Sequence, residues 1–454
     1  MRILKAEVKL NELFDDFTIQ FMESEKTTIH YLVGNNGAGK THPLVALFHA
    51  VSGTAASIYK DSSVKITASL EYDARKQEVF TTMEWKDNRI TQGDLYQEQN
   101  AFLITEGNLT KRQEREKKYR VAVYSEVEIN FEKQSVKSPT ADTPDSEIPT
   151  EISNKLNSQI PQILVNIQSQ DASLRSQWMA DNVGTAVPIE VPGEKMKRFR
   201  EAYNKIFGGE KKLKGVEIEG GEYKVLFTDN NGTDVDVSEL SSGEKQIVFR
   251  LGFILKNLDS TENCVVFIDE PEISLHPKWQ LQFKKILLEI FHDKNVQIII
   301  ATHSPYIFGE IDNNIEECIR VDRIANTADK IEFPQFNQSG LNDSPSMNLV
   351  NFKAYGIPST GLHIELYNAV QVACGSDTVK AAEEWLVTKG LPKTNYSVSQ
   401  SANYLKDNGN PSPHSAEETK PTWIRNSLNH PMVDRQNFNE TDLRDSIESM
   451  LNVL

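Results

Sequence analysis

The chain has 454 residues, of which 38% are hydrophobic and 25% charged, which excludes a disordered chain, a collagen or an isolated coiled coil. Acidic residues outnumber basic ones by 65 to 49, so the net charge of −16 argues against a broad basic surface for nucleic acid and leaves room only for a local patch. There is no run of ~18 apolar residues, no signal-peptide core and no close pair among the three cysteines, so a cytoplasmic protein without a membrane partner is expected.

The first ninety residues contain short runs rich in β-branched and aromatic side chains. These runs predict strands at residues 3–10, 17–21 and 28–33 and a hairpin with strands at 64–72 and 78–85. The third run ends in a glycine-rich loop, residues 34–41, after which apolar residues recur at helical spacing from Leu44 to Phe48. The order is therefore strand, glycine loop, helix.

An insertion is expected at residues 111–215. It begins with a charged run at 111–118, continues through a stretch rich in Pro, Ser and Thr at 133–153 that predicts a mobile linker, and then becomes helical to residue 207. Strands return at 216–219 and 223–227, followed by an amphipathic helix to residue 258. Two almost wholly apolar runs, 264–268 and 296–301, predict strands buried on both faces of a parallel sheet.

The loop at residues 34–41 (GNNGAGKT) matches the pattern G-x-x-x-x-G-K-[ST] in full. Glycines let several backbone N–H groups point at one polyphosphate, and the following helix adds its positive end. We expect Lys40 to reach the β- and γ-phosphates of this ligand and Thr41 to bind Mg²⁺. The predicted nucleotide-binding residues of this loop are Asn35, Asn36, Gly37, Ala38, Gly39, Lys40 and Thr41.

Acidic and imidazole side chains follow the two buried strands. The run at 263–272 (NCVVFIDEPE) brings Asp269 and Glu270 to the carboxyl end of a central strand, the edge at which open α/β sheets bind ligands. Asp269 is expected to hold Mg²⁺, and Glu270 to orient or deprotonate the attacking water. His303 follows the next buried strand, from which it can reach a γ-phosphate.

Residues 240–246 (LSSGEKQ) look like the signature motif of ABC-type ATPases. Together with GNNGAGKT, the DEPEISLHP run that ends at Pro277 and ATHSP at 301–305, this motif resembles the SMC-like and OLD-like ABC ATPases of repair and phage defence. The resemblance covers residues 1–110 and 216–325. His42 and Pro43 depart from it, because the family usually has Thr or Ser and an apolar residue there.

The resemblance implies an α/β fold: an ABC-type P-loop head with a mixed sheet and a helical insertion, plus a mainly α C-terminal domain. The implied divisions are an ATPase lobe at 1–110, the insertion at 111–215, a second ATPase lobe at 216–330 and a helical domain at 331–454. It also implies a homodimer or higher oligomer in which two heads enclose ATP. The residues that would meet the nucleotide of the other head are Ser241, Ser242, Gly243 and Glu244.

The C-terminal domain is expected to be helical at 359–373, 378–388 and 440–454. Arg425 and His430 have the spacing R-x4-H and resemble the catalytic pair of HEPN ribonucleases, which would act on RNA such as tRNA. An arginine can bind a scissile phosphate and a histidine can transfer protons near neutral pH. His363 and Glu365 could join this catalytic site. The alternative is a domain that docks a partner, in which Arg425 and His430 satisfy hydrogen bonds at helix ends.

Three functions fit these residues. The first is a sensor ATPase of antiphage defence, similar to those of Septu, PARIS, retron and anticodon-nuclease systems, which gates a nuclease that is either its own tail or a separate partner. The second is a RecF-like or SMC-like repair ATPase that clamps DNA, and the third is an ATP-gated scaffold. The basic runs at 111–118 and 195–200 keep a local nucleic-acid site open, although an acidic chain disfavours broad DNA contact.

Overall fold

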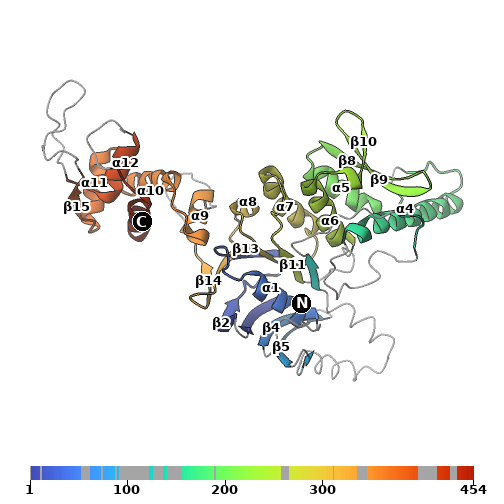
Figure 1. Cartoon of the computed structure of the whole chain (residues 1–454), viewed down its shortest axis with the longest axis horizontal. Helices are drawn as coiled ribbons and strands as arrows, with labels where there is room; N and C mark the ends of the chain where they lie inside the picture. Colours follow the sequence, from blue (N-terminus) through green and yellow to red (C-terminus); the bar gives the residue numbers. More distant parts are fainter. Residues whose placement is uncertain are drawn as a thin grey trace. The chain divides into compact units, whose positions relative to one another are not determined.

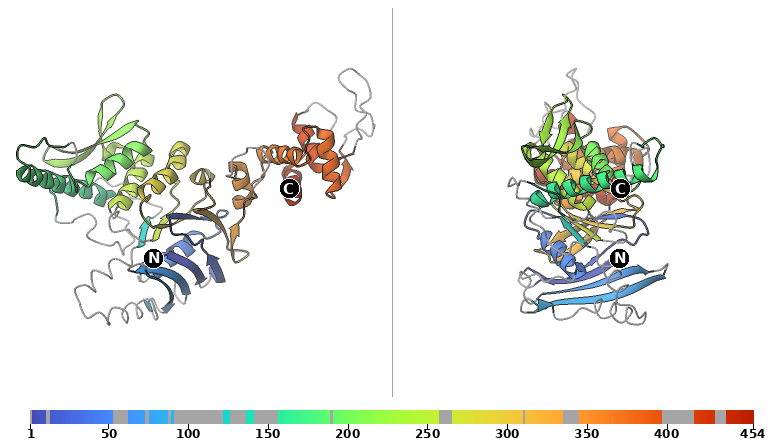
Figure 2. Two further views of the ribbon diagram at one scale, coloured as in Figure 1. Left: turned by 180° about the vertical axis from the view of Figure 1, so that it is seen from behind. Right: turned by 90° about the vertical axis from the view of Figure 1, so that its right-hand side faces the viewer.

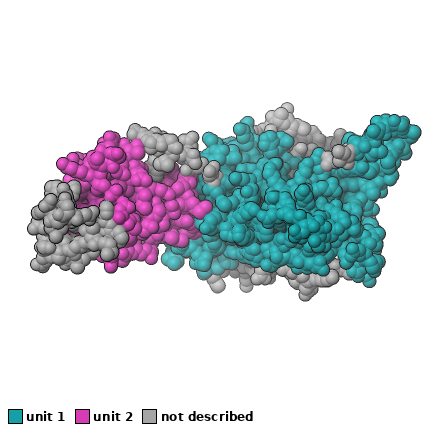
Figure 3. Space-filling model, turned by 90° about the horizontal axis from the view of Figure 1, so that it is seen from above, with its two compact units in different colours: residues 1–331 teal, residues 332–454 magenta. Residues whose placement is uncertain are grey.

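The chain forms two compact units, Met1–Ile331 and Glu332–Leu454, which Figure 3 shows in different colours. The computed structural model describes residues 2–10, 13–52, 62–72, 75–86, 89–90, 122–125, 136–140, 156–188, 191–256, 265–309, 311–334, 345–396, 417–429 and 437–454. The charged run at 111–118, most of the polar stretch at 133–153 and His430 lie outside the described residues. Among the described helices, none is long and apolar enough to cross a membrane.

A six-stranded sheet forms the centre of the first unit (Figure 1). Its order is β14-β13-β3-β12-β11-β7, and all neighbours are parallel except the antiparallel edge strand β14. Every residue of β3, β11 and β12 is buried, as expected for parallel strands covered on both faces. The strands are β3 (Thr28–Val33), β7 (Ala122–Ser125), β11 (Val265–Asp269), β12 (Gln297–Ala301), β13 (Glu316–Asp322) and β14 (Thr327–Ile331).

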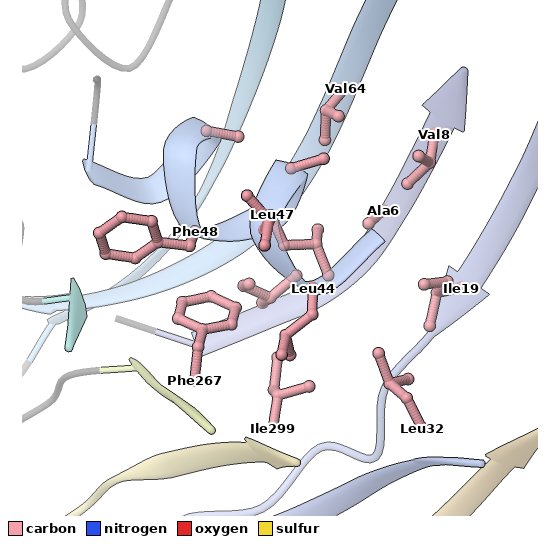
Figure 4. Packing of buried hydrophobic residues seen from close by; sticks show 14 of the residues in the cluster. Ala6, Val8, Ile19, Leu32, Leu44, Leu47, Phe48, Val64, Phe267 and Ile299 are labelled. Atoms are coloured by element: carbon pink, nitrogen blue, oxygen red, sulfur yellow. The ribbon is translucent and has the colours of Figure 1, made fainter. Parts of the chain in front are cut away.

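Helix α1 (Thr41–Ser52) contacts both the central sheet and a second, antiparallel sheet of order β2-β1-β4-β5-β6. Figure 4 shows Leu44, Leu47 and Phe48 of this helix facing buried side chains from both sheets, among them Phe267 and Ile299. This shared core fixes α1, and with it the loop before α1, against the end of β3. The strands are β1 (Arg2–Leu10), β2 (Phe14–Gln20), β4 (Ser62–Tyr72), β5 (Arg75–Lys86) and β6 (Arg89–Ile90).

A helical layer covers another part of the first unit, with a small sheet of order β10-β9-β8 beside it (Figures 1 and 2). Helix α6 lies against α4 and α5, and α5 also contacts α7 and β8. The elements are α4 (Leu156–Asp181), α5 (Met196–Ile206), α6 (Ser242–Lys256), α7 (Pro277–Ile290), α8 (Pro305–Phe308), β8 (Lys211–Glu219), β9 (Glu222–Asp229) and β10 (Asp234–Asp236).

The second unit is mainly helical and has its own core around Trp423, Tyr367 and Ile447. Four of its helices, α9, α10, α11 and α13, begin at side-chain caps, which satisfy N–H groups that a helix leaves unpaired. Ser359 and Thr378 cap α10 and α11, and Asn439 with Asp442 forms a capping box on the last helix. The elements are α9 (Met347–Tyr355), α10 (Thr360–Ala373), α11 (Val379–Thr388), β15 (Lys393–Asn395), β16 (Glu417–Thr419), α12 (Lys420–Asn429) and α13 (Glu440–Val453).

The predicted fold class is confirmed, because a P-loop follows the central strand of a mixed sheet and a mainly helical unit completes the chain. Three strands of the central sheet, β7, β13 and β14, have no counterpart among the predicted elements. Strand β13 carries Glu316 and Glu317 inside the protein, where Lys284 and His30 pair with them. Its polar sequence therefore lacks the apolar pattern by which a buried strand is identified.

Candidate nucleotide-binding site

Three glycines of the loop between β3 and α1, Gly34, Gly37 and Gly39, have positive φ, and two of them also lie close to neighbouring atoms. A Cβ atom on Gly34 (φ +150°) would lie 2.5 Å from the carbonyl oxygen of Val321, and one on Gly39 (φ +80°) would lie 2.8 Å from the ring of Phe14. At Gly34 the obstacle is main chain, and at Gly39 the left-handed backbone strains any residue with a side chain, so the loop favours glycine at both positions. The loop residues Asn35, Asn36 and Gly37 are exposed, as residues that receive a phosphate group should be.

Lys40 is only 4% exposed and points back into this loop. Its Nζ atom donates to the carbonyl oxygens of Gly34 (2.9 Å) and Asn35 (3.3 Å) and lies 3.0 Å from Nδ1 of His303. Burial lowers the pKa of Lys40 to about 8, although the nearby carboxylates of Glu270 and two other acidic residues oppose this shift. The ammonium group is thus held by weak acceptors, which an anionic phosphate oxygen can replace.

Asp269 is fully buried at the carboxyl end of β11. Its carboxylate accepts hydrogen bonds from Oγ1 of Thr41 and from the hydroxyl of Tyr124, each at 3.2 Å. Burial raises the pKa of Asp269 to about 6, and the bond from Thr41 offsets part of this rise. A hydroxyl and a buried carboxylate side by side are the oxygen donors that Mg²⁺ prefers, so these residues fit that ion.

Glu270 and His303 meet beside Lys40. The backbone of Glu270 has φ +41°, in the left-handed region that costs a side-chain-bearing residue about 1–2 kcal/mol. Its Oε1 lies 3.2 Å from Nε2 of His303, and burial and the charge of Lys40 lower the pKa of that histidine. A neutral imidazole that accepts from Lys40 and donates to Glu270 satisfies both contacts. Glu272 accepts a hydrogen bond from the backbone N–H of His303 and so fixes the loop that carries it.

The turn before α6 holds the residues of the signature motif. Ser241 and Ser242 are exposed, whereas Gly243 is buried where a Cβ atom would lie 2.4 Å from the carbonyl oxygen of Ser274. Glu244 accepts from the N–H and the hydroxyl of Ser241. The pKa of Glu244 is lowered, because these bonds and the ammonium group of a nearby lysine outweigh burial, which alone would raise it. In this structure Glu244 stabilises the start of α6 by capping it.

Two residues of the site are absent from the sequence-based expectations. Tyr124, on the edge strand β7, donates to Asp269. Arg250, on α6, is fully buried and donates to the main-chain oxygen of Asp269 at 2.9 Å. Arg250 stands in an otherwise apolar stretch of helix (IVFRLGFIL), and a lone charge in such a stretch indicates a buried partner.

In the second unit, Arg425 lies on α12, where it donates to Oδ1 of Asn426 at 3.0 Å, and Asn426 donates to Glu418. His430, the expected partner of Arg425, is outside the described residues. His363 is fully buried and lies 3.0 Å from the hydroxyl of Ser446. Glu365 accepts from Ser346 and Asn348. His363 and Glu365 therefore stabilise the packing of the unit.

Four features together define a P-loop ATPase of the ABC class. A phosphate loop joins β3 to α1, and paired carboxylates lie at the end of β11. A histidine follows β12, the strand between β3 and β11, and a signature turn precedes α6. Residues 29–309, more than half of the chain, match the family described as "AAA domain, putative AbiEii toxin, Type IV TA system". The chain belongs to this family.

Two curated relatives are retron proteins. The chain is 28% identical over 173 residues to the "Retron Vc95 probable ATPase" of Vibrio cholerae serotype O1 biovar El Tor. The aligned region covers 36% of this chain and 32% of the relative. It is 35% identical over 99 residues to the "Retron Ec83 probable ATPase" of Escherichia coli, covering 19% of this chain and 18% of the relative. The chain thus spans about a third or less of the length of these relatives.

Solved structures of SMC heads are also similar. One is a head bound to the C-terminal winged-helix domain of ScpA, with 14% identity, a TM-score of 0.42 and coverage of 73% of this chain and 98% of that one. Another is the SMC head domain from Thermotoga maritima, with 13% identity, a TM-score of 0.36 and coverage of 74% and 100%.

Proposed function

We propose that the protein binds and hydrolyses ATP with Mg²⁺. The observation that carries this proposal is the meeting of Lys40, Asp269, Glu270 and His303 at one edge of the central sheet, with contacts of 3.0–3.2 Å between Lys40 and His303, His303 and Glu270, and Thr41 and Asp269. No fold-building role requires two carboxylates, an ammonium group and an imidazole at one strand edge. A site for a polyphosphate, its cation and an attacking water requires all of them.

Each side chain has a separate task in this reaction. Lys40 leaves its carbonyl partners and pairs with phosphate oxygens. Thr41 and Asp269 would hold Mg²⁺, which neutralises phosphate charge when bound. Glu270 accepts a proton from the attacking water or orients it, and His303 donates at Nε2 to keep the carboxylate of Glu270 in place.

We further propose that ATP joins two copies of the chain. The exposed pair Ser241 and Ser242 lies at the positive end of α6, which suits a phosphate. Ser242 is eight residues before Arg250, which is about 12 Å along a helix, and Arg250 contacts Asp269. The turn is therefore displaced along α6 from the carboxylate edge of its own site and is open to the nucleotide of a second copy.

The retron relatives and the AbiEii-type family support a role in antiphage defence, in which the ATP state gates a nuclease. The effector is either the C-terminal unit, through Arg425 and His430, or a separate partner that docks on it. Incubation of the protein with tRNA, beside an Arg425→Ala/His430→Ala variant, distinguishes the two. Cleavage by the unmodified protein alone identifies the tail as the nuclease, and inertness of both proteins reduces the tail to a docking unit.

The core proposal is tested by Lys40→Ala and Glu270→Gln. Both variants should lose ATP hydrolysis, but only Glu270→Gln should keep ATP bound and elute as a stable dimer in light scattering with ATP and Mg²⁺. Ser242→Arg in the same Glu270→Gln background should return the protein to monomers without weakening ATP binding. Hydrolysis at the wild-type rate by either single variant would refute the ATPase, and an ATP-bound monomer of Glu270→Gln would refute the shared site.

A further inference from the structure

The peptide group between Asp269 and Glu270 is held from both sides. Its carbonyl oxygen accepts a hydrogen bond from Nη1 of Arg250 at 2.9 Å, and its N–H donates to the carbonyl oxygen of Ala301 at 2.8 Å. This peptide joins the expected Mg²⁺ ligand to the expected general base. Glu270 has φ +41°, a left-handed conformation that residues with a side chain ordinarily avoid. The two hydrogen bonds to this peptide therefore hold the backbone in an unfavourable conformation.

Arg250 is well built for this contact. Its side chain is fully buried, Nε donates to Oε1 of Gln246 at 3.1 Å, and Nη1 also lies 3.5 Å from the hydroxyl of Ser125. Gln246 is one helical turn earlier on α6, so the guanidinium group is fixed to that helix. Burial lowers the pKa of Arg250 to about 10, and the negative charges of Asp269, Glu272 and Glu270 oppose this shift.

Helix α6 begins at Ser242, the residue expected to meet the second nucleotide, and Arg250 is on the third turn of the same helix. A movement of the signature turn that carries α6 with it therefore also moves the guanidinium group that holds the Asp269–Glu270 peptide. The carboxylate of Glu270 moves with that peptide, because the Glu270 side chain is attached to the Cα atom that directly follows it. Its distance from the attacking water thus depends on where α6 lies.

We propose that Arg250 is a positioning residue that transmits the position of the signature helix to the general base Glu270. The inference rests on the proposed ATPase function and adds to it a physical link between the surface that meets one nucleotide and the carboxylate that acts on the other. Arg250 touches neither ATP nor water in this account. It acts only through the main chain of Asp269.

The test uses Arg250→Met, which removes the charge and the donors, and Arg250→Lys, which keeps a charge and one donor. ATP affinity should stay within about threefold of the wild type in both. Single-turnover hydrolysis should fall about 100-fold in Arg250→Met, the loss typical of a catalytic group misplaced by about 1 Å, and Arg250→Lys should recover about a tenth of the wild-type rate. In a Glu270→Gln background, Arg250→Met should still form the ATP-bound dimer.

Arg198→Met is the matched control, because Arg198 donates to a main-chain oxygen at the other end of α6, that of Lys256, at 3.1 Å. It should lower the thermal midpoint of unfolding without changing hydrolysis. If Arg250→Met hydrolysed ATP at a rate within threefold of the wild type, the inference would be overturned. The proposed ATPase function would still stand, provided that Glu270→Gln had lost hydrolysis. Parallel losses of ATP affinity and hydrolysis, with no rescue by lysine, would also overturn the inference, since a merely structural role produces that result.

Discussion

Replacing Gly243 by alanine probes how closely the signature helix approaches the loop after β11. The new Cβ atom would lie 2.4 Å from the carbonyl oxygen of Ser274 and 3.3 Å from the ring of Trp279, whereas ordinary contact begins at 3.4 Å. The obstacle at Ser274 is main chain, so no rotamer change relieves it. Ser274 itself has φ +63°, which leaves its backbone little freedom to retreat.

The start of α6 must therefore move by about 1 Å, and overpacking of this kind destabilises a folded protein by about 1–3 kcal/mol. The midpoint of urea unfolding should fall accordingly. Because the displaced turn is the part that would meet a second nucleotide, Gly243→Ala in a Glu270→Gln background should bind ATP normally, by fluorescence of a labelled analogue, but fail to dimerise in light scattering.

Ser242→Ala is the control, since it removes an exposed hydroxyl at the neighbouring position without a clash. It should weaken the dimer and leave the urea midpoint unchanged. If Gly243→Ala unfolded at the wild-type urea concentration and dimerised with ATP as its parent does, the close approach of α6 to Ser274 would have no energetic consequence, and the reasoning from it would be refuted.

Two further predictions concern Mg²⁺ and acid. Asp269→Asn should reduce Mg²⁺-dependent hydrolysis by about 100-fold and shift its Mg²⁺ titration to higher concentration, while ATP binding in EDTA stays unchanged; an unaltered titration would remove Asp269 as a ligand. Burial lowers the pKa of His363 to about 4, from the value of 6.5 that a histidine has in an unfolded chain. Between pH 4 and pH 6.5 the unfolded state therefore binds more protons than the folded state. Stability is then full above pH 6.5 and falls by up to about 3 kcal/mol as the pH drops toward 4. His363→Gln should flatten this dependence in urea unfolding followed by tryptophan fluorescence, and an equal slope in both proteins would contradict it.

The nucleotide site could be predicted where its residues are adjacent in sequence to a strand that is plainly apolar. The loop at 34–41 is contiguous, and Asp269, Glu270 and His303 each come after a run of buried apolar residues. Parallel strands bring such ends to one edge of a sheet, so their meeting could be inferred without knowing the fold in detail.

Tyr124 and Arg250 could not be placed in this way. Tyr124 reaches Asp269 because β7 pairs with β11, a partner more than 140 residues away that no local pattern specifies. Arg250 reaches the main-chain oxygen of the same residue from α6, and only tertiary packing decides which face of that helix meets the sheet. Strand β13 is not predictable for a different reason, since its two buried glutamates depend on partners from α7 and β3.

The fit of Gly34 against β13 has a thermodynamic consequence. There is no room for even one methyl group between Gly34 and the carbonyl oxygen of Val321 on β13. The start of the phosphate loop is therefore fixed against the central sheet before any ligand binds. Little conformational entropy is then left to lose on complex formation. Isothermal titration calorimetry with ADP should accordingly show a small heat-capacity change, without the large negative value that accompanies the ordering of a segment.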